Sequence, residues 1–156
     1  MANFIIRPAQ QDDVHILQHF IQQLAEIEQF PEPLSVTSER LLQHLFGPHA
    51  VAEALLIETA EQVIGYVIYY MTFASTTGTP GLHIDDLFVL PAAQGQGLGK
   101  RIMRHVAQLA RERSCIGSPL LQGLARGARF KPCQLFVMVG YCVRQFHQQA
   151  AALGRR

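Results

Sequence analysis

The sequence lacks an apolar run long enough to cross a membrane, and its start, MANFIIRPAQQDD, lacks the basic lead and apolar core of a secretory signal. We therefore expect a soluble, cytoplasmic protein without a membrane partner. Cysteine is scarce: Cys115, Cys133 and Cys142 show neither C-x-x-C spacing nor metal-ligand spacing to the histidines. This pattern predicts reduced thiols, no disulfide framework and no metal site.

Acidic residues are absent after Glu112, so the chain divides into two parts of opposite charge. Residues 1–114 contain all twelve acidic residues and seven basic ones, a net charge of −5, whereas residues 115–156 contain six basic residues, a net charge of +6. The six basic residues are scattered between apolar stretches rather than clustered, so we expect no nucleic-acid partner. The abrupt change indicates either a functional tail or an altered reading frame.

A chain of 156 residues, 49% of them apolar, is long enough for one domain with a substantial core and too short for two ordinary domains. Segments rich in β-branched and aromatic residues predict strands, and apolar residues at helical spacing predict helices. The expected strands span residues 3–7, 54–59, 62–73 and 82–90, and the expected helices span residues 12–28, 38–46 and 100–113. This order predicts an α/β (α+β) domain, a mixed sheet with helices on both faces.

The glycine-rich segment QGQGLGK, residues 94–100, lies between an expected strand and an expected helix. Free backbone N–H groups and the helix dipole favour a bound anion there, and glycine lets the backbone approach phosphate closely. The segment does not match a Walker A loop, because Arg101 stands where a hydroxyl would hold magnesium. It also does not match G-x-G-x-x-G, because the third glycine comes one residue early.

The segment does match Q/R-x-x-G-x-G/A, with Gln94, Gly97 and Gly99 at the defined positions. On this motif the chain resembles the GNAT superfamily of N-acetyltransferases, and within it the diamine acetyltransferases, which acetylate spermidine, spermine or thialysine. Residues 1–113 carry the likeness. Its five blocks, in the family's order and spacing, are MANFIIRPA, LAEIE, VIGYVIYYMTF, GLHIDDLFVLP and QGQGLGKRIM.

The resemblance implies a GNAT fold with a mostly antiparallel sheet, acetyl-CoA as cosubstrate, a small amine as acceptor and a homodimer. In that family the strand before the glycine loop hydrogen-bonds the pantetheine arm, and the loop amides hold the pyrophosphate. The matching coenzyme residues are Leu87, Phe88 and Val89 in the strand and Gln94, Gly95, Gln96, Gly97, Leu98, Gly99 and Lys100 in the loop.

The family's acidic residues for the acceptor amine match Asp85, Asp86 and Glu28. The resemblance implies that they bind the cationic amine and help to deprotonate it, since only a neutral amine attacks a thioester. Asp85 matches the catalytic position, although it is shorter than the glutamate usual there. Neighbouring side chains on a strand alternate between faces, so we expect at least one of the two aspartates to lie outside the catalytic site.

Residues 114–156 do not match the family, which has a further strand and then N-x-x-A-x-x-F-Y-x-x-x-G, whose tyrosine protonates the departing thiolate. Residues 134–139 could replace the strand and residues 143–153 the closing helix, with Tyr141 as the nearest general acid. We interpret residues 1–156 as one domain whose atypical end arose from a frameshift near codon 114. The alternative function is that of a coenzyme-binding or oligomeric protein, catalytically impaired by this replacement.

Overall fold

The structure is a computed structural model, and it describes residues 4–75, 78–95 and 97–115. The expected last strand (134–139), the expected closing helix (143–153), Gln96 and Tyr141 lie outside the described residues. None of the helices within the described ranges is long and apolar enough to span a membrane.

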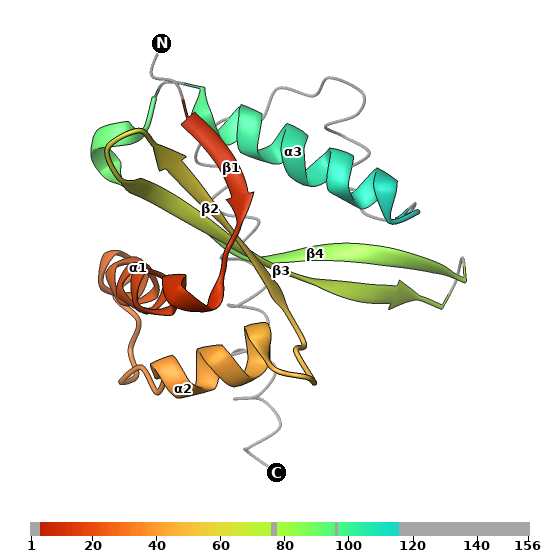
Figure 1. Cartoon of the computed structure of the whole chain (residues 1–156), viewed down its shortest axis with the longest axis horizontal. Helices are drawn as coiled ribbons and strands as arrows, with labels where there is room; N and C mark the ends of the chain where they lie inside the picture. Colours follow the sequence, from red (N-terminus) through yellow and green to blue (C-terminus); the bar gives the residue numbers. More distant parts are fainter. Residues whose placement is uncertain (1–3, 76–77, 96, 116–156) are drawn as a thin grey trace.

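Four strands form one antiparallel sheet in the order β1-β2-β3-β4 (Figure 1). They are β1 (Phe4–Pro8), β2 (Glu53–Thr59), β3 (Val63–Ala74) and β4 (Thr79–Val89). Every strand pair among the described residues is antiparallel, so this part of the sheet is antiparallel rather than mixed as predicted. The two longest strands, β3 and β4, form a hairpin that projects beyond the helices in Figure 1.

Helices cover both faces of the sheet, as the order of elements predicts (Figure 1). They are η1 (Gln11–Asp13), α1 (Val14–Ile27), α2 (Ser38–Leu41) with its π-helical continuation η2 (Leu42–Phe46), η3 (Pro91–Ala93) and α3 (Leu98–Glu112). One buried cluster joins α3 to the sheet through side chains such as Ile102 and Val106. A second cluster joins α1 and α2 to the opposite face through side chains such as Leu17 and Leu41. The sheet therefore separates an α3 face from an α1 face.

Strand β4 begins at Thr79, three residues before the predicted strand at residues 82–90. Thr79, Pro80 and Gly81 pair with the end of β3, opposite Ala74, Phe73 and Thr72. Proline is tolerated in an edge strand, so the pairing survives a composition typical of turns. Helix α3 also begins earlier than expected, at Leu98, directly after its N-cap residue Gly97, which has the left-handed conformation.

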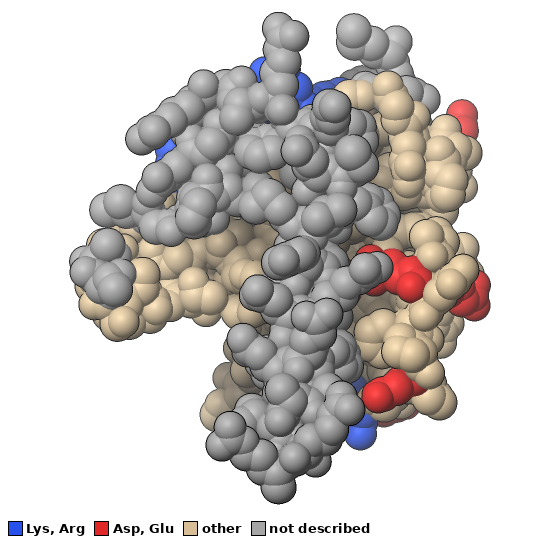
Figure 2. Space-filling view, turned by 180° about the vertical axis from the view of Figure 1, so that it is seen from behind, with Lys and Arg blue, Asp and Glu red and all other residues tan. Residues whose placement is uncertain are grey.

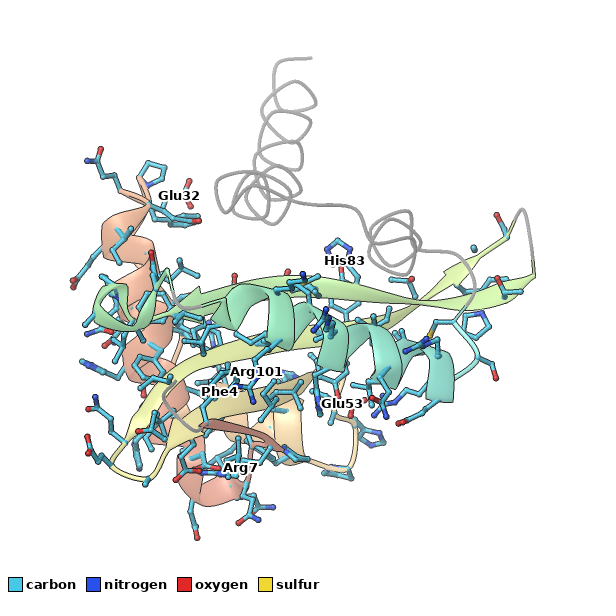
Figure 3. The ribbon with its side chains drawn as sticks, turned by 90° about the horizontal axis from the view of Figure 1, so that it is seen from above. Phe4, Arg7, Glu32, Glu53, His83 and Arg101 are labelled. Atoms are coloured by element: carbon cyan, nitrogen blue, oxygen red, sulfur yellow. The ribbon has the colours of Figure 1, made fainter. Side chains whose placement is uncertain are left out.

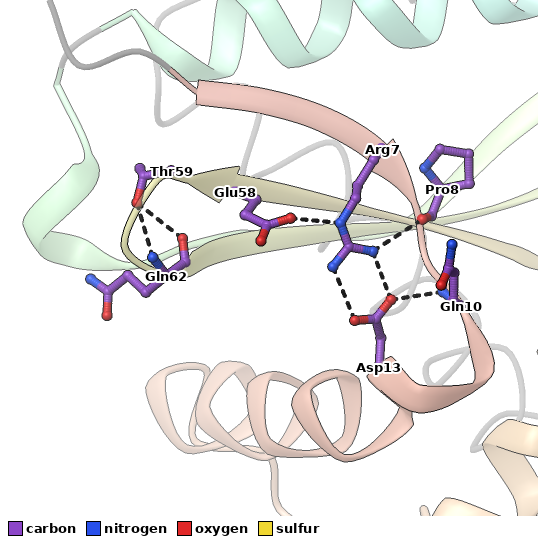
Figure 4. Close-up of polar contacts among 7 residues, drawn as sticks. All are labelled: Arg7, Pro8, Gln10, Asp13, Glu58, Thr59 and Gln62. Carbon is purple, nitrogen blue, oxygen red and sulfur yellow. Dashed lines mark hydrogen bonds and ion pairs between the residues drawn. The ribbon is translucent and has the colours of Figure 1, made fainter.

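Arg7 ties the first strand to its neighbour and to the first helix (Figure 4). Its Nε donates to Glu58 Oε2 at 2.6 Å, and its Nη1 and Nη2 donate to the two oxygens of Asp13 at 2.7 and 3.0 Å. The Gln10 backbone N–H also donates to Asp13. The hydrogen bonds from Arg7 lower the pKa of Asp13, which is buried at the start of α1. This network fixes where α1 begins.

Two arginines fasten α3 to the sheet. The Arg101 guanidinium lies 3.8 Å from the centroid of the Phe4 ring, a cation–π contact near the start of the helix (Figure 3). After the last turn, Arg113 Nη2 donates to Glu53 Oε2 at 2.7 Å, and Nη1 pairs with Oε1 of the same carboxylate. Tyr69 donates its hydroxyl to Glu53 at 2.9 Å. Both ends of α3 are thereby held against the sheet.

Candidate functional site: a coenzyme loop beside three carboxylates

The glycine loop connects the end of β4 to the start of α3. Gln94 closes it, because its side-chain amide donates to the Val89 carbonyl at 2.9 Å and its backbone N–H donates to Pro91 at 3.2 Å. Gly95 has φ 82° and Gly97 has φ 76°, backbone conformations that side-chain-bearing residues rarely adopt. The fold of this loop therefore depends on glycine at these two positions.

The loop also offers free amides and free space. Arg101 is the first residue of α3 whose N–H reaches back into the helix, to the Gly97 carbonyl at 3.3 Å, so the amides of Leu98, Gly99 and Lys100 have no intrahelical acceptor. A Cβ built on Gly95 or Gly97 would meet no atom within 4 Å. An anionic group can approach these amides closely, as the motif predicts for a pyrophosphate.

The strand residues predicted for the pantetheine arm lie at the end of β4. Leu87 is half-buried, and Phe88 and Val89 are buried. Within the described residues, β4 pairs only with β3, so its other edge presents backbone N–H and C=O groups. The β3 backbone approaches closely here: a Cβ on Gly65 would overlap the Phe88 carbonyl oxygen. Gly65 thus sets the position of this end of β4.

A β-bulge at Asp85 interrupts the regular ladder directly before Asp86. Ile68 pairs with Asp86 and the next residue, Tyr69, pairs with Ile84, so Asp85 is an extra residue on β4. Phe88, two residues after Asp86, packs on the α1 face, whereas Ile84 packs on the α3 face. Because of the bulge, the alternation of side chains between the two faces of the sheet is interrupted at Asp85. The faces of Asp85 and Asp86 therefore do not follow from alternation alone.

Asp86 is the most strongly perturbed carboxylate of the site. Burial, and then the negative charges of Asp85 and Glu28, raise its pKa to about 6, although a hydrogen bond from Tyr66 opposes the rise. Tyr66 donates its hydroxyl to Asp86 Oδ2 at 3.2 Å. Glu28 caps the C-terminal end of α1, and Asp85 is exposed. The fold therefore brings the three acidic residues predicted for the amine close enough to interact electrostatically.

Tyr66 was not among the predicted site residues. The sequence suggests only that Tyr66, Tyr69 and Tyr70 pack in the core or line the amine channel. The sequence offers one signal for Tyr66, which is a hydroxyl group within the apolar run VIGYVIYYMTF. Its contact with Asp86 depends on the register between β3 and β4, because Asp86 pairs with Ile68, two residues after Tyr66.

The acidic side chains in view in Figure 2, the view from behind, form separate groups along one side of the surface, among uncharged residues. They lie over the side of the molecule that carries α1 in Figure 1, while the Lys and Arg side chains in view lie mainly at the upper margin. A negative surface attracts cations before they bind. Its charge agrees with a positively charged acceptor rather than an acidic one.

Comparison with known proteins decides the family. Residues 20–121 match the acetyltransferase (GNAT) family. The chain belongs to this family. As a GNAT N-acetyltransferase it uses acetyl-CoA, which confirms the coenzyme predicted from the glycine loop.

Curated relatives of this GNAT protein include the thialysine N-epsilon-acetyltransferase of Mus musculus, 29% identical over 123 residues, which cover 74% of this chain and 72% of that protein. The corresponding protein of Sus scrofa is 28% identical over the same shares. The spermidine/spermine N(1)-acetyltransferase-like protein 1 of Homo sapiens is 30% identical over 122 residues, 74% of this chain and 17% of that protein.

Solved structures share the fold of this GNAT protein. A ribosomal-protein-alanine N-acetyltransferase from Brucella melitensis biovar Abortus 2308 superposes with a TM-score of 0.60 at 24% identity, over 72% of this chain and 76% of that one. A predicted acetyltransferase from Clostridium acetobutylicum, solved with acetyl-CoA, has a TM-score of 0.60 at 18% identity, over 83% and 90% of the two chains. At these identities the likeness concerns the fold.

Proposed function

We propose that this GNAT protein transfers the acetyl group of acetyl-CoA to a primary amine of a small cationic substrate, of polyamine or thialysine type. The observation that carries the proposal is the convergence of Glu28, Asp85 and Asp86 beside the strand that leads into the coenzyme loop. Three neighbouring carboxylates favour a ligand with one or more ammonium groups. The names of the curated relatives support the same class of acceptor.

Acetyl-CoA supplies the thioester whose acetyl group is transferred. The loop amides from Gly97 to Lys100 hold its pyrophosphate. The edge of β4 at residues 87–89 that has no partner strand among the described residues binds its pantetheine arm. These assignments follow the family motif and fit the open loop and the unpaired strand edge described above. Gln96 belongs to the same predicted set.

The acceptor must lose a proton before it can attack. The family resemblance predicts Asp85 as the base; we assign the proton transfer to Asp86, because a carboxylate with a pKa of about 6 exchanges protons near neutral pH. Asp85 and Glu28 hold the ammonium group. The neutral amine then forms the C–N bond as the C–S bond breaks, and Asp86 returns its proton to solvent. Tyr141 is the predicted donor of one proton to the departing sulfur, and the surplus proton of the newly acetylated nitrogen restores Tyr141.

An alternative remains for the same fold: a coenzyme-binding or oligomeric protein whose catalysis is impaired because residues 114–156 replace the family's last strand and catalytic tyrosine. The composition of these residues, six basic and no acidic, supports this alternative. Resequencing the gene around codon 114 tests the proposed frameshift. An intact frame, with the same tail in homologues, would contradict it.

One parallel experiment separates these functions. Calorimetry measures acetyl-CoA binding, and mass spectrometry measures the acetylation of spermidine and thialysine. Binding with turnover of either amine supports the proposed function, whereas binding without turnover supports the impaired protein. Failure to bind acetyl-CoA would contradict both.

The predicted homodimer and cytoplasmic location belong to this proposal as well. Light scattering after size-exclusion chromatography tests the dimer, which would have twice the chain mass of 17.4 kDa. A mass of one chain at micromolar concentration would contradict it.

A further inference from the structure

We propose that Tyr66 is a positioning residue of the acetyl transfer: its buried hydroxyl holds one oxygen of Asp86 and so fixes the carboxylate that receives the proton of the amine. This inference rests on the proposed function for its catalytic meaning. The contact between the two side chains can be tested without turnover.

The geometry makes Tyr66 a rigid donor. Its side chain is fully buried, with 0% exposed, and its ring lies parallel to that of Phe20 in α1 at a centroid distance of 6.2 Å. Phe88 of β4 packs against it from another side at 6.1 Å. These contacts hold the ring, so the hydroxyl meets Asp86 Oδ2 at 3.2 Å from a fixed position. The carboxylate directly follows the bulge, where the ladder alone orients it less.

The charged and titratable groups that face Asp86 come from three elements. Asp85 lies beside it on β4, Glu28 faces it from the end of α1, and Tyr66 faces it from β3. Burial and the two carboxylates favour the protonated form of Asp86. Among the described residues, the hydroxyl of Tyr66 is the group that favours the ionised form.

Tyr66 remains a neutral donor throughout the working range of the enzyme. Burial first, and then the charge of Asp86, raise the pKa of Tyr66 far above its usual value. It therefore donates its proton to the hydrogen bond and does not lose it. Its contribution is to lower the pKa of Asp86, so that this carboxylate stays ionised, and able to accept a proton, down to a lower pH than its burial and its neighbouring carboxylates alone would allow.

The Tyr66→Phe variant tests this role, because it removes the hydroxyl and keeps the ring. Without the donor, the protonated form of Asp86 is favoured, so the pKa of Asp86 rises. Since 3.2 Å is long for an O–H···O bond, we expect a shift of about half a pH unit to one unit rather than two. Carbon-13 NMR of aspartate-labelled free enzyme measures the midpoint, and Asp86→Asn identifies the signal.

The same shift should appear in the kinetics. The acid limb of the kcat/KM profile for spermidine should move upward, so that a one-unit shift lowers kcat/KM about fivefold at pH 6 and little at pH 8.5. In an Asp86→Asn background, Tyr66→Phe should change the remaining rate little, because its effect passes through Asp86. Denaturation curves verify that each variant is folded.

Tyr69→Phe is a matched control. Tyr69 is also buried, with 2% exposed, and also donates to a carboxylate, but that carboxylate is Glu53 and the contact lies on the α3 face. Tyr69→Phe should leave the Asp86 midpoint unchanged. Tyr66→3-fluorotyrosine keeps the hydroxyl and makes it a stronger donor, so it should lower the midpoint. It also provides a test if Tyr66→Phe fails to fold.

Each outcome is decisive. An Asp86 midpoint that rises in Tyr66→Phe, falls with 3-fluorotyrosine and stays constant in Tyr69→Phe supports the inference. An unchanged midpoint in folded Tyr66→Phe, or in the fluorinated variant, overturns it. Because NMR reads the free enzyme, a lack of acetylation would count against the proposed function and not against the contact between Tyr66 and Asp86.

Discussion

Burial and two neighbouring carboxylates disfavour the ionised form of Asp86, and the pH dependence of the acetylation rate should reflect this. The pKa of Asp86 is raised to about 6, so kcat/KM for the amine should rise with pH through about 6. Asp86→Asn should remove this limb and lower kcat by about 10²-fold or more, since a general base typically contributes that much. Initial rates between about pH 5 and pH 9 measure both effects.

Asp85→Asn is the matched control, since Asp85 is adjacent but exposed. It should keep the limb near pH 6 and mainly raise KM, because its proposed role is to hold the amine. If Asp85→Asn removes the limb and Asp86→Asn does not, the base is Asp85, as the family resemblance predicts.

The same carboxylate should make stability depend on pH. The folded-state pKa of Asp86 lies above the value of 3.8 for an unperturbed aspartate, so the folded state binds more protons between pH 3.8 and about 6. The contribution of Asp86 to the free energy of unfolding must therefore fall as pH rises through that window. Asp86→Asn should be more stable than the wild type at pH 8, as denaturant titration can measure. Equal or lower stability of a folded Asp86→Asn would contradict the unfavourable charge.

The contribution of Asp13 to stability depends on pH in the opposite direction. Arg7 lowers its pKa, so its contribution to stability is present above the unfolded pKa and is lost as pH falls through the lower folded value. Asp13→Asn leaves Arg7 with fewer partners and should cost about 2–3 kcal/mol of unfolding free energy at pH 7. Asp12→Asn is the control, because Asp12 is exposed and adjacent. Equal losses in the two variants would show that the Arg7 network contributes nothing specific.

At the scale of elements, the glycine at the start of α3 should affect both the stability of the fold and the binding of acetyl-CoA, and the two effects can be measured separately. Gly97→Ala places a side chain at φ 76°, which costs about 1–2 kcal/mol, although its Cβ has free space. The same variant should weaken acetyl-CoA binding at least tenfold, because the Cβ stands where the phosphate approaches. Calorimetry measures the binding, and thermal denaturation measures the stability.

Gly78→Ala provides the matched control for this change. Gly78 has φ 66° and equally free space, but it lies in the turn between β3 and β4. It should lose similar stability and keep its affinity for acetyl-CoA. If both variants bind acetyl-CoA equally well, the loop at residues 94–100 is not the pyrophosphate site.

The elements also show what the sequence could predict. Patterns of apolar and β-branched residues predicted the four strands and the longer helices of the described residues within a few positions, because these residues follow the two-faced burial of the sheet. They did not predict the short helix η3. They also did not predict that residues 79–81 are paired, because threonine, proline and glycine are typical of turns. Nor could they reveal the bulge at Asp85, since an extra residue is defined only by the strand that it faces.

At the scale of the whole molecule, the candidate site combines segments that are distant in the sequence. Glu28 comes from the end of α1, Tyr66 from β3 and Asp86 from β4. The family resemblance predicted the two carboxylates, because their motifs are local. It did not predict Tyr66, because the hydrogen bond depends on strand pairing and on the packing of α1. The acidic residues of the site were thus easier to predict than the hydrogen bond from Tyr66 that influences the charge of Asp86.

The carboxylate cluster should make substrate binding sensitive to salt. Exposed charges are screened over about 10 Å at 0.1 M salt and about 3 Å at 1 M salt. The KM for spermidine should therefore rise more steeply with salt than the KM for an acceptor with one amine, such as a short alkylamine. Steady-state assays at matched pH compare the two. Equal salt dependence would contradict recognition through several charges.

The bulge at Asp85 has a consequence for the evolution of this protein. Deleting Asp85 would join Ile84 directly to Asp86 and restore a regular ladder without changing the other pairs, so Leu82 and Ile84 would stay buried on the α3 face. A single-codon deletion at this position would thus act as the loss of one exposed carboxylate and of the local bend more than as a lesion of the core. Related genes should therefore tolerate a change in length at Asp85 more readily than at the buried positions of β4 on either side of it.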